Sequence, residues 1–360
     1  MVKRVYNFNP GPATLPLSVL EKAQAELLDY KGTGMSIMET SHRSKEFDDV
    51  ISEASALLKM VYAVPDNYKV LWLQGGASTQ FFMIPKNLMM SKKGADYVNT
   101  GTWSKKAIKE AKLLGDINVV ASSEDRNFSY IPKDINFSPN ASYVHITSNN
   151  TIFGTQWQEY PDCGDAPLVA DMSSDILSRK VDVGKFGMMY AGAQKNMGPS
   201  GVTAIIIRED LISRASDELP TMLKYKTHAE KNSLFNTPPC FPIYICKLVL
   251  EWVKENGGAN GAGQRNRQKA DMIYKVIDES NGYYSGHAEK DSRSMMNVTF
   301  RLPSDELGAK CVEEAKAQGL VGLKGHRSVG GMRASIYNAM PVEGAKKVSE
   351  FLKEFQERNQ

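Results

Sequence analysis

The stretch from Met188 to Ile207, MMYAGAQKNMGPSGVTAIII, joins two apolar runs through a loop of small residues. The first run ends at Gly192, the second begins at Val202, and Lys195 lies between them. Short apolar runs bounded by glycine and proline are typical of buried strands. We therefore expect two strands joined by a loop that carries Lys195.

Lys195 has the setting of an amine that forms imines. Lysine is rarely buried without a functional reason. Burial lowers the pKa of the ammonium group and so produces the neutral amine, which is the nucleophilic form. From this stretch alone, the alternative is a surface lysine in a hairpin loop.

A carboxylate ends a strand further upstream. The apolar run Leu168–Ala170 is followed by Asp171. Pyridoxal phosphate needs such a pair, because a lysine holds its aldehyde as an imine and a carboxylate keeps its pyridine nitrogen protonated. Taken alone, an aspartate at a strand end is more often a helix cap or a solvated strand terminus.

Strand and helix patterns alternate along the first two thirds of the chain. Helical spacing of apolar residues marks Leu17 to Leu28 and Phe47 to Val61. The predicted strands are Tyr68–Leu73, Tyr97–Asn99, Ile117–Val120, Tyr143–Ile146, Leu168–Ala170, Met188–Ala191 and Val202–Ile207. Such alternation predicts an α/β domain with a mostly parallel sheet.

The last third of the chain has a different pattern. The glycine-rich stretch Asn256–Gly263 is typical of a linker or hinge. The elements predicted after it are helix Gln264–Ser280, strand Met296–Phe300, helix Asp305–Gln318, strand Met332–Ile336 and helix Val342–Phe355. Because 360 residues exceed one ordinary domain, we expect a large domain over 16–256. Residues 1–15 and 257–360 would form a smaller α+β C-terminal domain.

Three further strand ends carry residues suited to a cofactor. Gly75-Gly76 opens a helix whose N-terminus could hold a phosphate. Trp103 could stack on a flat ring, and a hydroxyl within the stretch 148–151, Ser-Asn-Asn-Thr, could bond a phenol oxygen. Ligands of open α/β sheets bind at such an edge. Each feature alone is weak, since a glycine pair is common and a tryptophan is more often core.

Composition and other motifs exclude several classes of protein. No GxGxxG or GxxxxGK[ST] motif is present, which argues against dinucleotide-binding and P-loop enzymes. A net charge of +3 gives no argument for nucleic acid or membrane binding. The four cysteines and five histidines show no spacing typical of metal sites or disulfides. With no signal peptide or membrane span recognised, we expect a cytoplasmic enzyme.

Cationic side chains occur in two places that could bind anions. His42 and Arg43 lie between the first two predicted helices. His326, Arg327 and Arg333 lie near the C-terminus. Arginine side chains match the geometry of carboxylates and phosphates. Ordinary surface charge is the alternative for each residue taken alone.

Several of these stretches together resemble the phosphoserine aminotransferases, a family of class V pyridoxal-phosphate enzymes. The stretches are Asn7–Ala13, Ser41–Arg43, Gln74–Ser78, Thr102–Trp103, Ala193–Asn196, Phe235–Pro238 and His326–Ser335. The last, HRSVGGMRAS, separates this family from other class V aminotransferases. The resemblance covers almost the whole chain. It implies a fold-type I homodimer whose large domain has a mostly parallel seven-stranded sheet and whose active site lies at the dimer interface.

The resemblance also implies a role for each candidate residue around pyridoxal 5'-phosphate. Lys195 would form the imine and Asp171 would pair with the pyridinium nitrogen. Trp103 would stack on the ring and Thr151 would contact its phenol oxygen. The phosphate would be held by Ala77, Ser78 and Gln194, and by Asn236 and Thr237 of the other subunit. Some members carry an arginine where this chain has Ala77-Ser78.

The implied reaction moves the amino group of L-glutamate to 3-phosphohydroxypyruvate, which yields O-phospho-L-serine and 2-oxoglutarate. Arg333 would bind the α-carboxylate. His42 and Arg43 of the neighbouring chain would join His326 and Arg327 on the phosphate or the γ-carboxylate. Whether 4-phosphohydroxythreonine is a second substrate, for pyridoxine synthesis, stays open.

Two other functions fit parts of the sequence. Cysteine desulfuration on the same fold needs a mobile cysteine, whereas Cys311 lies in a predicted helix. A non-catalytic α/β binding protein would require the pairing of Lys195 with Asp171 to be accidental. Such a protein would lack a bound chromophore.

Overall fold

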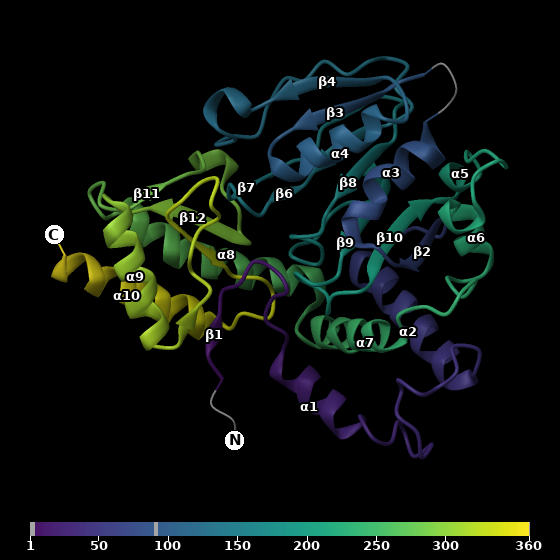
Figure 1. Cartoon of the computed structure of the whole chain (residues 1–360), viewed down its shortest axis with the longest axis horizontal. Coiled ribbons are helices and arrows are strands. Elements are labelled where there is room, and N and C mark those ends of the chain that lie inside the picture. Colours follow the sequence, from purple (N-terminus) through teal and green to yellow (C-terminus); the bar gives the residue numbers. More distant parts are fainter. Residues whose placement is uncertain (1–3, 90–92, 360) are drawn as a thin grey trace.

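The computed structural model describes residues 4–89 and 93–359 and is built around a seven-stranded sheet (Figure 1). The strand order is β2-β10-β9-β8-β5-β3-β4. The strands are β2 (Tyr68–Leu73), β3 (Ala95–Asn99), β4 (Ile117–Ser122), β5 (Val144–Thr147), β8 (Leu168–Asp171), β9 (Phe186–Gly192) and β10 (Thr203–Arg208). All seven predicted strands are confirmed, with bounds that differ by at most two residues.

Only β10 runs against its neighbours in this sheet; it pairs antiparallel with both β2 and β9. The other adjacent strands are parallel. A parallel neighbour would need a crossover of a dozen or more residues, whereas the loop over 193–202 is shorter than that. This loop carries Lys195, so the antiparallel turn places the lysine at the end of β9.

Helices cover both faces of the sheet, and the two-residue period of the strands decides which side chains meet them. In β2, Val70 and Trp72 join the core beneath α1, α2 and α7. Leu71 and Leu73 join the core beneath α3, α4, α5 and α6. These helices are α1 (Leu17–Ala25), α2 (Lys45–Tyr62), α3 (Gly76–Leu88), α4 (Thr102–Lys112), α5 (Glu209–Ile212), α6 (Tyr225–Glu230) and α7 (Cys240–Glu255).

The C-terminal third forms a second layer, drawn in yellow-green in Figure 1. Its elements are α8 (Gly258–Asp278), β11 (Ser285–Gly286), β12 (Asn297–Arg301), α9 (Asp305–Ala317), β13 (Leu320–Val321), β14 (Met332–Ser335) and α10 (Val342–Arg358). Strand β1 (Tyr6–Asn7) pairs with β13, and Phe8 is buried in the core of this layer. The division at residue 256 stays a prediction, since Ala259 of α8 still packs in the core of the large sheet.

Two predicted elements are wrong in their bounds or kind. The first helix ends at Ala25 rather than near Leu28, whose side chain is 85% exposed. The stretch Asn256–Gly263 is not a flexible linker, because α8 begins inside it at Gly258. Gly261 serves close packing, since a Cβ there would collide with the carbonyl oxygen of Asn256, whereas Gly257 and Gly258 have positive φ angles at the start of α8.

A buried polar network attaches the C-terminal layer to the large sheet. Asn149 lies in β6 (Asn149–Asn150), which pairs with β7 (Thr155–Gln156) beyond the end of β5. Its Nδ2 donates to Asn297 Oδ1 at 2.8 Å, and Ser294 donates to its Oδ1 at 2.5 Å. All three side chains are buried. Since an unpaired buried amide is costly, this network fixes β12 and β14 against the strand ends.

No helix within residues 4–89 and 93–359 combines the length and the apolar character needed to cross a bilayer.

The environment of two helical glycines predicts opposite effects of the same substitution. A Cβ on Gly308 in α9 would meet no atom within 4 Å, so Gly308→Ala should stabilise the fold by about 0.5–1 kcal/mol. Gly261→Ala should instead destabilise it by about 1–3 kcal/mol, because the new methyl meets backbone. Denaturant unfolding of both variants measures this. Equal shifts of the same sign would contradict the packing role of Gly261.

Candidate active site

Lys195 lies at the carboxyl edge of the large sheet, in the loop after β9. Its Nζ donates to Thr151 Oγ1 at 2.7 Å and lies 5.3 Å from the ring centroid of Trp103. The pKa of Lys195 is lowered to about 8, mainly by burial; the charge of Asp171 opposes this effect and that of Arg333 adds to it. Far more neutral amine is therefore present near neutral pH than for an ordinary lysine, as imine formation requires.

Asp171 ends β8, and its carboxylate is oriented by the next turn. The backbone N–H and the hydroxyl of Ser173 both donate to Oδ1, at 2.9 and 2.6 Å. No hydrogen bond to Oδ2 is found among the described residues, so this oxygen is left for a ligand. Burial raises the pKa of Asp171, which the bonds from Ser173 and the charge of Lys195 partly offset. A cationic partner would favour the ionised carboxylate further.

Trp103 presents a flat ring beside the lysine. It lies in the first turn of α4, and Gly101 caps this helix in the short connection from β3. A side chain on Gly101 would press on Asn150 and Phe153, both about 3.0 Å from a Cβ at that position. The indole N–H of Trp103 is buried without a partner among the described residues. A buried unpaired donor of this kind is suited to a polar ligand atom.

The glycine loop after β2 forms the N-terminus of α3. Gly75 and Gly76 have φ angles of 86° and 65°, which favour glycine. A Cβ on Gly75 would also overlap the side chain of Thr79. Ala77 and Ser78 therefore lie in the first turn of a 13-residue helix, where backbone N–H groups are free to bind an anion.

Gln194 is held beside Lys195 by small neighbours. A Cβ on Gly192 would lie 2.8 Å from Gln194 Oε1, so only glycine leaves room for this side chain. The backbone carbonyl of Gln194 accepts a bond from Ala13 N at 2.9 Å. The N-terminal segment thus packs against the lysine loop.

Arg333 brings the C-terminal layer to the site. It lies in β14, is 5% exposed, and donates from Nη1 to the carbonyl oxygen of Thr151 at 3.3 Å. Its Nε is buried with no partner among the described residues. Burial lowers the pKa of Arg333, yet the guanidinium stays charged. Because no carboxylate among the described residues pairs with this guanidinium and its Nε is unused, it is suited to bind a carboxylate ligand.

His326 and Arg327 occupy the loop between β13 and β14, next to Arg333. His326 Nδ1 lies 2.6 Å from Ser328 Oγ. The pKa of His326 is lowered by burial first and then by the charges of Arg333, Arg327 and Lys106. A bound dianion would reverse this effect by screening the cations.

The four remaining predicted residues form a separate group in this chain. His42 Nδ1 lies 3.3 Å from Thr237 Oγ1, with Arg43 and Asn236 adjacent in sequence. Gln74 donates to the carbonyl oxygen of Thr237 at 3.3 Å. No hydrogen bond between described residues joins this group to Lys195. Nε2 of His42 is buried without a described partner.

Sequence reasoning missed three residues that touch the site. Lys106 places its Nζ 4.4 Å from the ring centroid of Trp103, and the helical i, i+3 spacing of the two could have revealed it. Ser173 bonds the carboxylate of Asp171 two residues before it, a spacing that is too common in turns to single it out. Tyr337 donates to Pro10 O at 2.7 Å and is one of the groups around Thr151, but no local pattern marks it.

The residues present fit pyridoxal phosphate. Lys195 supplies an amine with a lowered pKa, Asp171 an oriented carboxylate oxygen, and Trp103 a flat face beside the lysine. The α3 N-terminus supplies free backbone donors for a phosphate. These groups lie at one edge of the sheet, where open α/β sheets bind ligands.

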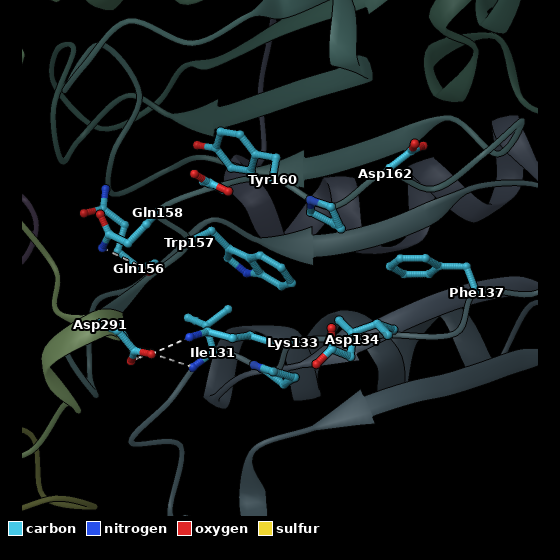
Figure 2. A pocket seen from close by; sticks show the side chains of 15 residues that line it. Ile131, Lys133, Asp134, Phe137, Gln156, Trp157, Gln158, Tyr160, Asp162 and Asp291 are labelled. Carbon is cyan, nitrogen blue, oxygen red and sulfur yellow. Dashed lines mark hydrogen bonds and ion pairs between the residues drawn. The ribbon is translucent and has the colours of Figure 1, made fainter.

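Two other features do not belong to this site. A cavity of about 650 Å³, shown in Figure 2, is lined by residues such as Trp157 and Tyr160. Its apolar lining belongs to the core on the α2 and α7 face, and it contains none of the predicted site residues.

Cys311 is buried within α9, and burial raises the pKa of its thiol to about 12. This buried thiol does not suit the mobile nucleophile of a desulfurase.

The described part of the chain offers no cluster of three His, Cys, Asp or Glu side chains that could hold a metal ion.

Comparisons with known proteins place these residues in context. The family model described as aminotransferase class-V matches residues 5–348. A curated relative from Desulfosudis oleivorans, named phosphoserine aminotransferase, is 60% identical, with 100% of each chain covered. A Bacillus subtilis protein of the same name is 55% identical over 100% of each chain. The solved phosphoserine aminotransferase of Bacillus circulans subsp. alkalophilus is 54% identical, with a TM-score of 0.98 over 100% of each chain.

The lowered pKa of Lys195 predicts the pH dependence of cofactor uptake. In the cofactor-free protein, the rate of pyridoxal phosphate capture should rise with pH and level off above about 8, because the neutral amine is the nucleophile. An ordinary lysine would continue to gain reactivity toward 10.5. Asp171→Asn should move the plateau to lower pH, since the carboxylate raises the pKa of Lys195. Stopped-flow absorbance measures both, and a rise continuing to pH 10 would contradict the assignment.

Proposed function

The chain belongs to the class-V aminotransferases, and we propose that it transfers the amino group of L-glutamate reversibly to 3-phosphohydroxypyruvate, giving O-phospho-L-serine and 2-oxoglutarate. The observation that carries the proposal is the meeting of Lys195 and Asp171 with the buried, unpaired Arg333 at one edge of the sheet. This reaction belongs to serine biosynthesis. Relatives at 55–60% identity over the full length carry the corresponding name.

When bound, pyridoxal phosphate supplies an aldehyde that condenses with amines and a ring that accepts the electrons of the substrate α-carbon. Asp171 holds a proton on the ring nitrogen, and Ser173 keeps its carboxylate in place. Trp103 stacks on the ring and Thr151 contacts the phenol oxygen. The phosphate is bound by Ala77 and Ser78 at the α3 N-terminus and by Gln194. Asn236 and Thr237 of the other subunit complete this pocket.

Lys195 moves the proton that transamination requires. With its Nζ free, Lys195 would act as general base and then as general acid, and would so move the proton of the substrate α-carbon. A pKa near 8 suits both steps, because the amine is basic enough to accept the proton and acidic enough to release it. Thr151, which now bonds Nζ, can hold the amine on this side of the ring.

Arg333 binds the α-carboxylate that both substrates share. The second anion is a γ-carboxylate in glutamate and a phosphate in the acceptor, at a similar distance from the amine. His326 and Arg327, joined by His42 and Arg43 of the partner subunit, bind either anion. His326 is disposed to be neutral in the empty pocket, and a dianionic phosphate favours its protonation.

We further propose a homodimer with the active site at the interface. Exposed apolar side chains flank the residues expected from the partner: Met35 and Met38 precede His42, and Phe235 precedes Asn236. Their exposed fractions are 44%, 57% and 41%. Exposed apolar side chains gathered beside predicted site residues favour a protein interface there.

The four free cysteines support a reducing, cytoplasmic location.

The test of the function is a coupled assay on the cofactor-loaded protein. It follows 2-oxoglutarate formation from glutamate, with 3-phosphohydroxypyruvate compared against pyruvate, oxaloacetate and glyoxylate. We expect kcat/KM to favour the phosphorylated acceptor by about 100-fold or more, as buried charge pairing allows. Lys195→Ala should lose turnover and keep its fold. An equal response to pyruvate would refute the anion pocket, and near wild-type activity of Lys195→Ala would refute the mechanism. The reverse assay with 4-phosphohydroxythreonine as donor tests the second substrate.

Mixing two inactive variants tests the shared site. One chain carries Lys195→Ala, and the other carries His42→Ala with Arg43→Ala. If the partner supplies His42 and Arg43, each hybrid dimer contains one intact site. Random exchange of subunits should then restore about a quarter of the wild-type activity. No gain over the unmixed variants, with exchange verified by tagged subunits, would place both residues in their own chain's site.

A further inference from the structure

Lys269 is a buried lysine that the proposed reaction does not use. It lies in α8, is 1% exposed, and has no acidic partner among the described residues. Its Nζ donates to three backbone carbonyls, those of Ile336 at 2.8 Å, Tyr337 at 2.7 Å and Met340 at 3.0 Å. The three N–H groups of the ammonium are thus all used on one turn.

An apolar side chain would fill the same space at lower cost. Burying an ammonium without a carboxylate is expensive, and here burial and Arg265 lower the pKa of Lys269 to about 7. The three carbonyl dipoles oppose this effect, because they favour the charged form. As a consequence, the ammonium group of Lys269 holds three carbonyl groups of the turn 336–340 close to one another.

That turn touches both chain segments that flank Lys195. On one side, the backbone N–H of Asn338 donates to Asn196 Oδ1 at 2.8 Å, next to the lysine. On the other side, Tyr337 donates to Pro10 O at 2.7 Å. The residue after Pro10 is Gly11, where a Cβ would lie only 3.1 Å from Lys195 Cγ. The aliphatic part of Lys195 therefore lies against the segment that Tyr337 holds.

We propose that Lys269 is a positioning residue for Lys195: by gathering three carbonyls of the turn 336–340, it fixes Asn196 and the Pro10–Gly11 segment on either side of the lysine. Lys269 touches neither substrate nor cofactor, and it acts through the turn. The part that concerns turnover rests on the proposed function. The part that concerns the geometry of Lys195 does not.

The decisive variant is Lys269→Met, which keeps an unbranched side chain only one atom shorter and removes its donors. We expect the pH midpoint of the bound cofactor's visible absorbance, which reports the proton on the Lys195 nitrogen, to shift by about half a unit or more. We expect kcat to fall about tenfold while KM for glutamate changes less than about twofold, because a misplaced lysine affects the proton transfer more than binding.

Ile273→Ala is the matched control, because this residue lies one turn further along α8 and is fully buried in the same layer. It should lower the melting temperature without moving the absorbance midpoint or kcat. If Ile273→Ala changes both to the same extent as Lys269→Met at a similar loss of melting temperature, Lys269 only stabilises the fold. An unchanged midpoint and kcat in Lys269→Met would equally overturn the proposal.

Lys269→Gln keeps two donors and serves if Lys269→Met does not fold. In Lys269→Gln, the absorbance midpoint and kcat should change in the same direction as in Lys269→Met, but by less. Wild-type values of both quantities would overturn the proposal. The absorbance titration needs no substrate. If the wild-type protein did not turn over the phosphorylated acceptor, the titration would still decide the role of Lys269.

Discussion

The hydrogen bond from Asn149 to Asn297 holds the site together, because it joins the ends of the parallel strands to the C-terminal layer. Lys195 and Asp171 come from the large sheet, whereas Arg333 comes from β14. Only the attachment of the two layers brings this arginine against Thr151, beside the lysine. The network is buried and its members pair with one another, so sliding one layer over the other would leave amides unpaired.

Burial makes Lys195 more reactive, and it also leaves charged groups of the site without partners until a ligand binds. It lowers the pKa of Lys195 and raises that of Asp171, so burial disfavours the charged form of both groups in the empty pocket. Arg333 keeps a charge that the surrounding chain does not neutralise. Ligands that bring a protonated ring nitrogen and two anions satisfy these groups together.

Local sequence patterns predicted the large sheet well and the connections less well. All seven strands were recognised from short apolar runs. The reason is plainest for the central strands such as β5, β8 and β9, because a strand buried on both faces must be apolar on both. The edge strand β4 has no fully buried residue. The stretch Asn256–Gly263 was wrongly predicted to be a hinge. Glycine is permissive in a loop, but here it lets the start of α8 pass close to the carbonyl of Asn256. Composition alone does not tell whether a glycine is present because the backbone is flexible there or because a side chain would not fit.

The class of fold could be predicted from the sequence alone, because the strands are locally recognisable. The ends of two of these strands also suggested the pair of Lys195 with Asp171 and with it the cofactor, and the structure brings the two charges close enough to interact. The resemblance added the substrate pair. Other contacts emerge only from the folded chain: the hydrogen bond of Lys195 to Thr151, the charge of Lys106 that acts on His326, and the bonds of Lys269 to the turn 336–340. The two hydrogen bonds join residues more than forty positions apart. No local period records such contacts, because they arise when elements distant in the sequence pack together.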